Sequence, residues 1–186
     1  MFVRDQFAQT PVVVHCNTRQ LICGGADVYD ELAGIQLLDL VDELGVTDDT
    51  IVVYSTDNGV HMNTWPDAGM TPFRNEKNSN WEGGYRVPTM IKWPGVIEPG
   101  QIVVDILHVT DLYTTFARLG GAMEYIPTDR VIDGVDQTSL FLNGDGFSRR
   151  DYVMIYVGPS LAAGVKGRFK RDWKNATPGL SKNEFY

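Results

Sequence analysis

Apolar and polar positions follow two different periods along the chain, and each period predicts one kind of element. Over residues 26–44 the apolar positions recur every three or four residues, which is typical of an amphipathic helix. The stripe consists of Val28, Leu32, Ile35, Leu38 and Val41, widened by Leu37, Leu40 and Leu44. Gly45 stands where a glycine commonly ends a helix.

Residues 50–56 follow that helix and are apolar almost without interruption. Such a run is typical of a strand buried on both faces. Shorter β-branched and aromatic runs predict further strands at residues 11–15, 89–93 and 152–157.

A second helix is predicted over residues 111–119, with Thr110 as its N-cap and Gly120-Gly121 as its stop. Its inward side chains are expected to be Leu112, Phe116 and Leu119. Helices that alternate with buried strands indicate an α/β domain with a largely parallel central sheet.

Composition narrows the classes of function. The 186 residues are 43% hydrophobic, enough for one packed domain, and the formal net charge is −8. An acidic chain is not expected to bind nucleic acid or a membrane surface, because both partners are anionic. No apolar run approaches the length of a membrane-spanning helix.

The sequence leaves the compartment open. The first residues lack the charged start and apolar stretch of a signal peptide, and Asn175-Ala176-Thr177 is only weak evidence for secretion. Cys16 and Cys23 form neither a disulfide framework nor a zinc-binding pattern.

The candidate chemistry begins at the end of the strand over residues 50–56. Asp57-Asn58-Gly59 places a carboxylate beside an amide oxygen at a sharp turn, a combination that suits Ca²⁺ or Mg²⁺. The same three residues are also ordinary turn chemistry, which is the more common outcome for this composition.

Residues 71–88 form a polar, glycine-rich segment that carries Phe73, Trp81 and Tyr85. A polar loop anchored by aromatic side chains is typical of a binding loop on a rigid scaffold. Lys77 could supply a positive charge to an anionic substrate, or it could be a solvated surface lysine.

Taken together, these segments resemble the sulfatase family, specifically the arylsulfatases of the alkaline-phosphatase-like superfamily. The resemblance covers about residues 11–175, in the family's order and spacing. Its segments are the helix ending at Leu44-Gly45, the strand and turn over 48–59, Lys77 with Trp81-Glu82-Gly83-Gly84-Tyr85-Arg86-Val87-Pro88, Trp93-Pro94-Gly95, and residues 108–116, 133–136 and 165–170.

The resemblance implies a role for each matching residue. Asp57 and Asn58 would be two ligands of a Ca²⁺ ion, and Lys77 would contact the sulfate group and neutralise charge in the transition state. His61 could approach the substrate, or it could be structural. Supporting roles would belong to Trp81, Glu82, Gly83, Gly84 and Arg86, although Glu82 and Arg86 could simply form a local ion pair.

The resemblance also implies a partial alkaline-phosphatase-like fold. Residues 1–147 would form part of the catalytic α/β domain, and residues 148–186 the start of a C-terminal subdomain with a small antiparallel sheet. Family members are often periplasmic, secreted or lysosomal. The family's nucleophile is a formylglycine made from Cys or Ser in a Cys/Ser-x-Pro-x-Arg motif, which this sequence lacks; Cys16-Asn17-Thr18-Arg19 has no proline. The paired N-terminal aspartates of the metal site are missing as well.

The expected activity is therefore hydrolysis of a small-molecule sulfate ester, most naturally an aryl sulfate, to an alcohol or phenol and sulfate. This chain would carry only part of that active site. One alternative is a non-catalytic truncated sulfatase that binds a cation or a partner chain. Another is a phosphate-ester hydrolase of the same superfamily, although the setting of Lys77 favours sulfate. An incomplete core would favour self-association.

Overall fold

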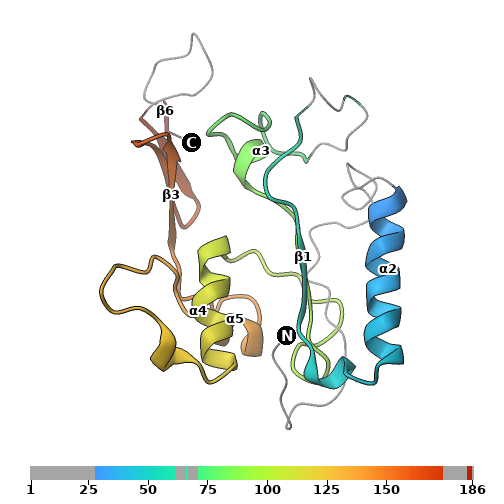
Figure 1. Ribbon diagram of the computed structural model, residues 1–186. Coiled ribbons are helices and arrows are strands. Elements are labelled where there is room, and N and C mark those ends of the chain that lie inside the picture. The colour runs from blue at the N-terminus through green and yellow to red at the C-terminus, as the bar shows by residue number, and fades with distance from the viewer. Residues whose placement is uncertain (1–27, 62–65, 67–70, 174–183, 186) are drawn as a thin grey trace. The chain divides into compact units, whose positions relative to one another are not determined.

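The computed structural model describes residues 28–61, 66, 71–173 and 184–185 (Figure 1). The strand expected at residues 11–15, both cysteines and the Asn175 triplet lie outside these residues. The chain divides into two compact units, each described separately below. The first contains residues 38–54 and 90–151, and the second draws on residues 28–37, 55–89 and the chain from Tyr152 onward.

The first helix, α2 (Val28–Glu43), confirms the helical period of the sequence. Gly45 follows it at φ 65°, a conformation that favours glycine, and donates a backbone hydrogen bond to Asp42. Leu38 and Val41 are half-buried, as expected. The predicted widening of the stripe is wrong, because Leu37, Leu40 and Leu44 are exposed. Periodicity identifies a helical face, but it does not say what covers that face.

Strand β1 (Val52–Ser55) pairs with β2 (Thr89–Lys92) in a two-stranded sheet. Val52 and Val53 are half-buried but Tyr54 is 38% exposed, so the prediction of burial on both faces is wrong at this end of β1. Within the described residues, β1 has a neighbouring strand on one side only. Those residues contain this pair and a four-stranded antiparallel sheet, and no parallel central sheet.

The core of the first unit lies around β2 and two helices, α4 (Val109–Leu119) and α5 (Thr138–Asn143). Its buried members are Ile91, Trp93, Ile97, Leu140 and Phe141. Leu112, Phe116 and Leu119 pack against them, as the sequence predicts. Two short 3₁₀ helices, η1 (Thr47–Asp49) and η2 (Met123–Tyr125), complete the unit.

The N-cap of α4 is His108, so the prediction of Thr110 is wrong. The ring nitrogen Nδ1 of His108 accepts a hydrogen bond from the Thr110 backbone at 3.4 Å, and the backbone N–H of His108 donates to Asp111 at 3.0 Å. This reciprocal arrangement is a capping box, in which the first helical turn satisfies its own free N–H groups.

The second unit contains a four-stranded antiparallel sheet, which confirms the small antiparallel sheet expected near the C-terminus. Its strands are β3 (Tyr152–Val157), β4 (Ser160–Lys166), β5 (Phe169–Asp172) and β6 (Glu184–Phe185). Alternate residues of β5 are buried, which places Lys170 and Asp172 on one face and Phe169 and Arg171 on the other. None of the helices in the described part of the chain is long and apolar enough to cross a membrane.

Candidate functional site

Two backbone hydrogen bonds join the turn after β1 to the segment that carries Lys77. The Gly59 N–H donates to the Gly84 carbonyl at 3.0 Å, and the Lys77 N–H donates to the Val60 carbonyl at 2.8 Å. Asp57, directly before this junction, is exposed, and Asn58 is half-buried. The structure thus brings the predicted metal-binding turn and the backbone of Lys77 into one local site.

At this junction the backbones approach so closely that positions 59 and 83 have no room for a Cβ atom. A Cβ atom on Gly59 would lie 1.7 Å from the Gly83 carbonyl oxygen. A Cβ atom on Gly83 would lie 1.9 Å from the Asn75 carbonyl oxygen. Both glycines are therefore required for backbones to approach, and Gly83-Gly84 lie in the short helix α3 (Glu82–Tyr85).

Lys77 lies in a tight turn that points its side chain to solvent. Asn75 and Asn78 have φ values of 67° and 70°, in the left-handed region that asparagine tolerates better than most residues. The Ser79 hydroxyl donates to the Glu76 carbonyl at 2.6 Å and closes the turn. The Lys77 side chain is exposed, so its ammonium group is accessible to an anionic ligand.

The residues predicted to support the site make three kinds of contact. Trp81 is buried, and the Arg74 guanidinium lies 3.9 Å from the centre of its ring. Glu82 forms an ion pair with Lys170 at 3.1 Å. Arg86 lies 4.4 Å from the centre of the Phe73 ring. The alternative of a local Glu82–Arg86 ion pair is therefore wrong.

The donor chemistry of Asp57 and Asn58 fits a hard cation, since both offer side-chain oxygens. Ca²⁺ takes about six to eight oxygen ligands, so these two residues could supply only part of a site. Within residues 28–61, 66, 71–173 and 184–185, no group of three or more His, Cys, Asp or Glu side chains could hold a metal ion. His61 is half-buried and follows Val60 at the junction, and its contact with substrate stays a prediction.

A buried polar cluster beside the Lys77 turn was not anticipated from the sequence. The Asn80 side chain donates to the Asp172 carboxylate at 2.7 Å, and the Lys170 ammonium donates to the Asn80 carbonyl at 2.5 Å. Asn80 and Asp172 are fully buried and Lys170 is 8% exposed. The signal in the sequence was only the pair of charged residues at alternate positions of β5.

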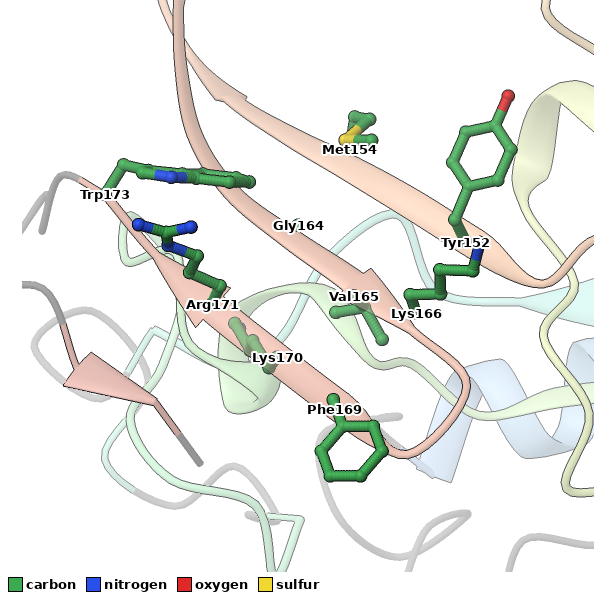
Figure 2. Close-up of a pocket in the computed structure, with 9 residues that line it drawn as sticks. All are labelled: Tyr152, Met154, Gly164, Val165, Lys166, Phe169, Lys170, Arg171 and Trp173. Atoms are coloured by element: carbon green, nitrogen blue, oxygen red, sulfur yellow. The ribbon is translucent and has the colours of Figure 1, made fainter.

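The four-stranded sheet has an open hollow of about 340 Å³ on the face that carries Phe169 and Arg171 (Figure 2). Figure 2 shows the Arg171 side chain beside the Trp173 indole, and their guanidinium-to-ring distance is 5.4 Å. The hollow is lined by Tyr152, Met154, Gly164, Val165, Lys166, Phe169, Lys170, Arg171 and Trp173. The exposed aromatic rings are compatible with the expected self-association, which stays a prediction.

Comparison with known protein families identifies the family of this chain. The sequence profile described as Sulfatase matches residues 30–122, half of the chain. The chain belongs to the sulfatase family. The matched region contains the turn after β1, Lys77 and α3, which are among the segments on which the resemblance rested; residues 133–136 and 165–170 lie outside it.

Over the aligned residues, this chain is about one-third identical to curated relatives. It is 38% identical to steryl-sulfatase of Rattus norvegicus over 134 residues, which are 69% of this chain and 23% of that protein. It is 33% identical to N-acetylgalactosamine-6-sulfatase of Mus musculus over 153 residues, 77% of this chain and 29% of the relative. The chain therefore spans about a quarter of the length of these sulfatases.

Solved structures show that the arrangement of elements is that of a sulfatase. The chain matches the PsFucS1 sulfatase from Pseudoalteromonas sp. with a TM-score of 0.74 and 33% identity, covering 84% of this chain and 32% of that one. It matches Ps i-CgsB, solved in complex with k-i-k-neocarrahexaose, with a TM-score of 0.70 and 22% identity, covering 84% of this chain and 34% of the other. The second likeness speaks for the fold alone.

Proposed function

We propose that this chain forms part of a sulfuric ester hydrolase, in which Lys77 binds the sulfate group of the substrate. The observation that carries the proposal is the hydrogen-bonded junction of Gly59 with Gly84 and of Lys77 with Val60. This junction joins the loop of Lys77, whose ammonium group is exposed, to the turn that carries the side-chain oxygens of Asp57 and Asn58. An anionic ester needs such positive charge where negative charge develops during the reaction.

Asp57 and Asn58 are proposed as ligands of a Ca²⁺ ion in the complete enzyme. When bound, such a cation polarises the sulfate oxygens and offsets their charge. Lys77 donates hydrogen bonds to a sulfate oxygen, and the narrow Gly59–Gly83 contact keeps its loop against the turn after β1. The nucleophile is not among the recognised residues of this chain.

The substrate is proposed to be an aryl or related sulfate ester of an alcohol or phenol. Relatives of this chain include a steryl-sulfatase, an N-acetylgalactosamine-6-sulfatase and an arylsulfatase of Hemicentrotus pulcherrimus, the last 32% identical over 140 residues. All three names refer to sulfatases, and they differ in the compound that carries the sulfate group. The shared chemistry is what Lys77 would recognise.

Anion titration of the isotope-labelled chain tests this assignment. Inorganic sulfate, added in the presence of Ca²⁺, should shift the backbone amide resonance of Lys77, with a Kd on the order of millimolar because one exposed ammonium group gives little binding energy. Lys77→Ala should weaken the sulfate affinity reported by neighbouring amides about tenfold and leave a residual affinity that can still be measured. Lys92→Ala, in β2, is the matched control and should have the sulfate affinity of the unmodified chain.

Two outcomes would count against the proposal. Equal sulfate affinity in Lys77→Ala and in the unmodified chain would remove Lys77 from sulfate binding. A preference for inorganic phosphate over sulfate of tenfold or more, about 1.4 kcal/mol, would favour a phosphate-ester hydrolase instead.

A further inference from the structure

Strand β5 holds the segment after Lys77 from its buried side. The ammonium group of Lys170 donates to the Asn80 carbonyl at 2.5 Å and to the Glu82 carboxylate at 3.1 Å. Two residues farther along the same face of β5, the Asp172 carboxylate accepts a hydrogen bond from the Asn80 side chain at 2.7 Å. We call Asn80, Glu82, Lys170 and Asp172 the β5 clamp.

The Lys77 turn needs such support because it has little regular structure of its own. It contains two left-handed residues, Asn75 and Asn78, and is followed by only one turn of helix, α3. Left-handed backbone in non-glycine residues persists only where the surroundings hold it. Upstream support comes from the Lys77 N–H bond to Val60, and downstream support begins at Asn80.

The burial of Lys170 makes its two bonds costly to lose. Its side chain is 8% exposed, and Glu82, its ionic partner, keeps 33% of its side chain exposed. A buried ammonium group left without partners is strongly destabilising, so Lys170 fixes where the Asn80 carbonyl and Glu82 can lie. The Trp81 ring between them lies 5.9 Å from the same ammonium group.

We propose that Lys170 is a positioning residue for Lys77. It does not touch the substrate; it fixes the backbone at residues 80–82 so that the turn presents the Lys77 ammonium group in one place. The inference rests on the proposed role of Lys77 in binding sulfate. The β5 clamp thereby couples the C-terminal sheet to the sulfate-binding loop within one compact unit.

The decisive variant is Lys170→Met, which keeps the apolar stem and removes both bonds. Its matched control is Lys166→Met, an exposed lysine in the neighbouring strand β4. Backbone amide exchange of Lys77 and Gly83 should accelerate about tenfold or more in Lys170→Met and stay unchanged in Lys166→Met. Amides that join β3 to β4 should remain protected in both variants.

A double-mutant cycle separates positioning from general stability. Lys170→Met should weaken sulfate binding about fivefold to tenfold when Lys77 is present, and should have no further effect in the Lys77→Ala background. A purely structural role would weaken residual anion binding by the same factor in both backgrounds. If Lys170→Met does not fold, Glu82→Gln removes the charge of the pair with little change of shape and should show the same coupling at smaller size.

The outcomes that overturn the inference differ from those that overturn the proposed function. Lys170→Met with the sulfate affinity and amide exchange of Lys166→Met would refute the positioning role while leaving Lys77 in place. Additive effects in the cycle would refute it as well. If Lys77→Ala alone leaves sulfate affinity unchanged, the proposed function fails and the positioning role fails with it.

Discussion

The guanidinium group of Arg150 binds the carboxylate of Asp111 at 2.6 Å, with side-chain exposures of only 6% and 0%. Asp111 also accepts a hydrogen bond from the Val135 N–H at 2.8 Å, and Arg150 donates to the Asp133 carbonyl at 2.6 Å. One buried ion pair thus ties the start of α4 to the chain on both sides of α5. The hydrogen bonds make this pair the polar centre of the first unit.

Removing one partner of this pair should destabilise the protein strongly. Arg150→Met leaves the Asp111 carboxylate buried without its counter-charge, and the expected loss is about 3–5 kcal/mol in the free energy of unfolding. Arg130→Met is the control, because Arg130 pairs with Asp129 at the surface, where both side chains are about two-thirds exposed. Its expected change is within about 0.5 kcal/mol. Urea unfolding measures both, and equal losses would contradict the assignment.

The free energy of unfolding should decrease in two steps as the pH is lowered. Burial, followed by the charge of Arg150, holds the pKa of His108 below its ordinary value of 6.5. The unfolded chain therefore takes up this proton first, so the free energy of unfolding decreases as the pH falls below about 6.5. The physical cause is local, because the Nδ1 atom of His108 accepts the Thr110 N–H only when it is unprotonated.

The second step belongs to two carboxylates. Burial by itself would raise the pKa of Asp111, but hydrogen bonds from Arg150, Val135 and His108 outweigh it and hold the pKa below the ordinary 3.8. The pKa of Asp136 is likewise lowered, because bonds from Thr138 and Arg118 outweigh burial. Their stabilisation is complete above about pH 3.8 and is lost as the pH falls through the lower folded-state values.

Urea unfolding from about pH 7.5 to about pH 3 checks both steps. His108→Asn keeps a capping side chain without a titrating ring, so the step near pH 6.5 should shrink while the acidic step remains. An unchanged slope between about pH 7.5 and pH 5 in His108→Asn would assign that step to another histidine.

Gly83→Ala should disrupt the junction that supports Lys77. The new Cβ would meet the Asn75 carbonyl oxygen at 1.9 Å, so the backbone must move, at an expected cost of about 1–3 kcal/mol. The amide resonances of Gly59 and Lys77 should shift with it. Gly100→Ala is the control: its φ of 76° brings strain of about 1 kcal/mol, but nothing lies within 4 Å, so those resonances should not move.

Local elements were predictable because their signal is local. The bounds of β3 agree with the sequence, and those of α4 and β2 differ by at most two residues. The exposure of Leu37 and Leu40 was not predictable, because the helical period names a face without naming its cover. The junction of the Asp57 turn with Lys77 followed only from family resemblance, since no local pattern relates the two loops.

The β5 clamp lies beyond any local pattern. Lys170 and Asn80 are 90 residues apart, and the contact joins a strand to a backbone carbonyl in a turn. A carbonyl acceptor leaves no trace in residue identity, so neither composition nor periodicity could reveal it. Strand β5 has one apolar residue, Phe169, which is exposed, whereas the charged residues Lys170 and Asp172 are the buried ones.

The last prediction is that the 186-residue chain, purified alone, does not hydrolyse aryl sulfates. Turnover needs a nucleophile, a filled cation site and donors aimed at the sulfate group, whereas the recognised residues here are Asp57, Asn58 and Lys77. Hydrolases that lose their nucleophile keep roughly 10³–10⁴-fold acceleration over water, and the recognised residues here offer only part of the roughly six to eight oxygen ligands that Ca²⁺ takes.

A chromogenic aryl sulfate assay with added Ca²⁺ checks this, with Asp57→Ala as the paired variant. The expected signal is the buffer rate for both proteins. Calcium-dependent turnover that disappears in Asp57→Ala would contradict the prediction, because it would require both a nucleophile and a working cation site within this chain. Turnover that persists in Asp57→Ala would contradict the prediction as well, and it would separate the activity from the turn after β1 and from the site that Lys77 shares.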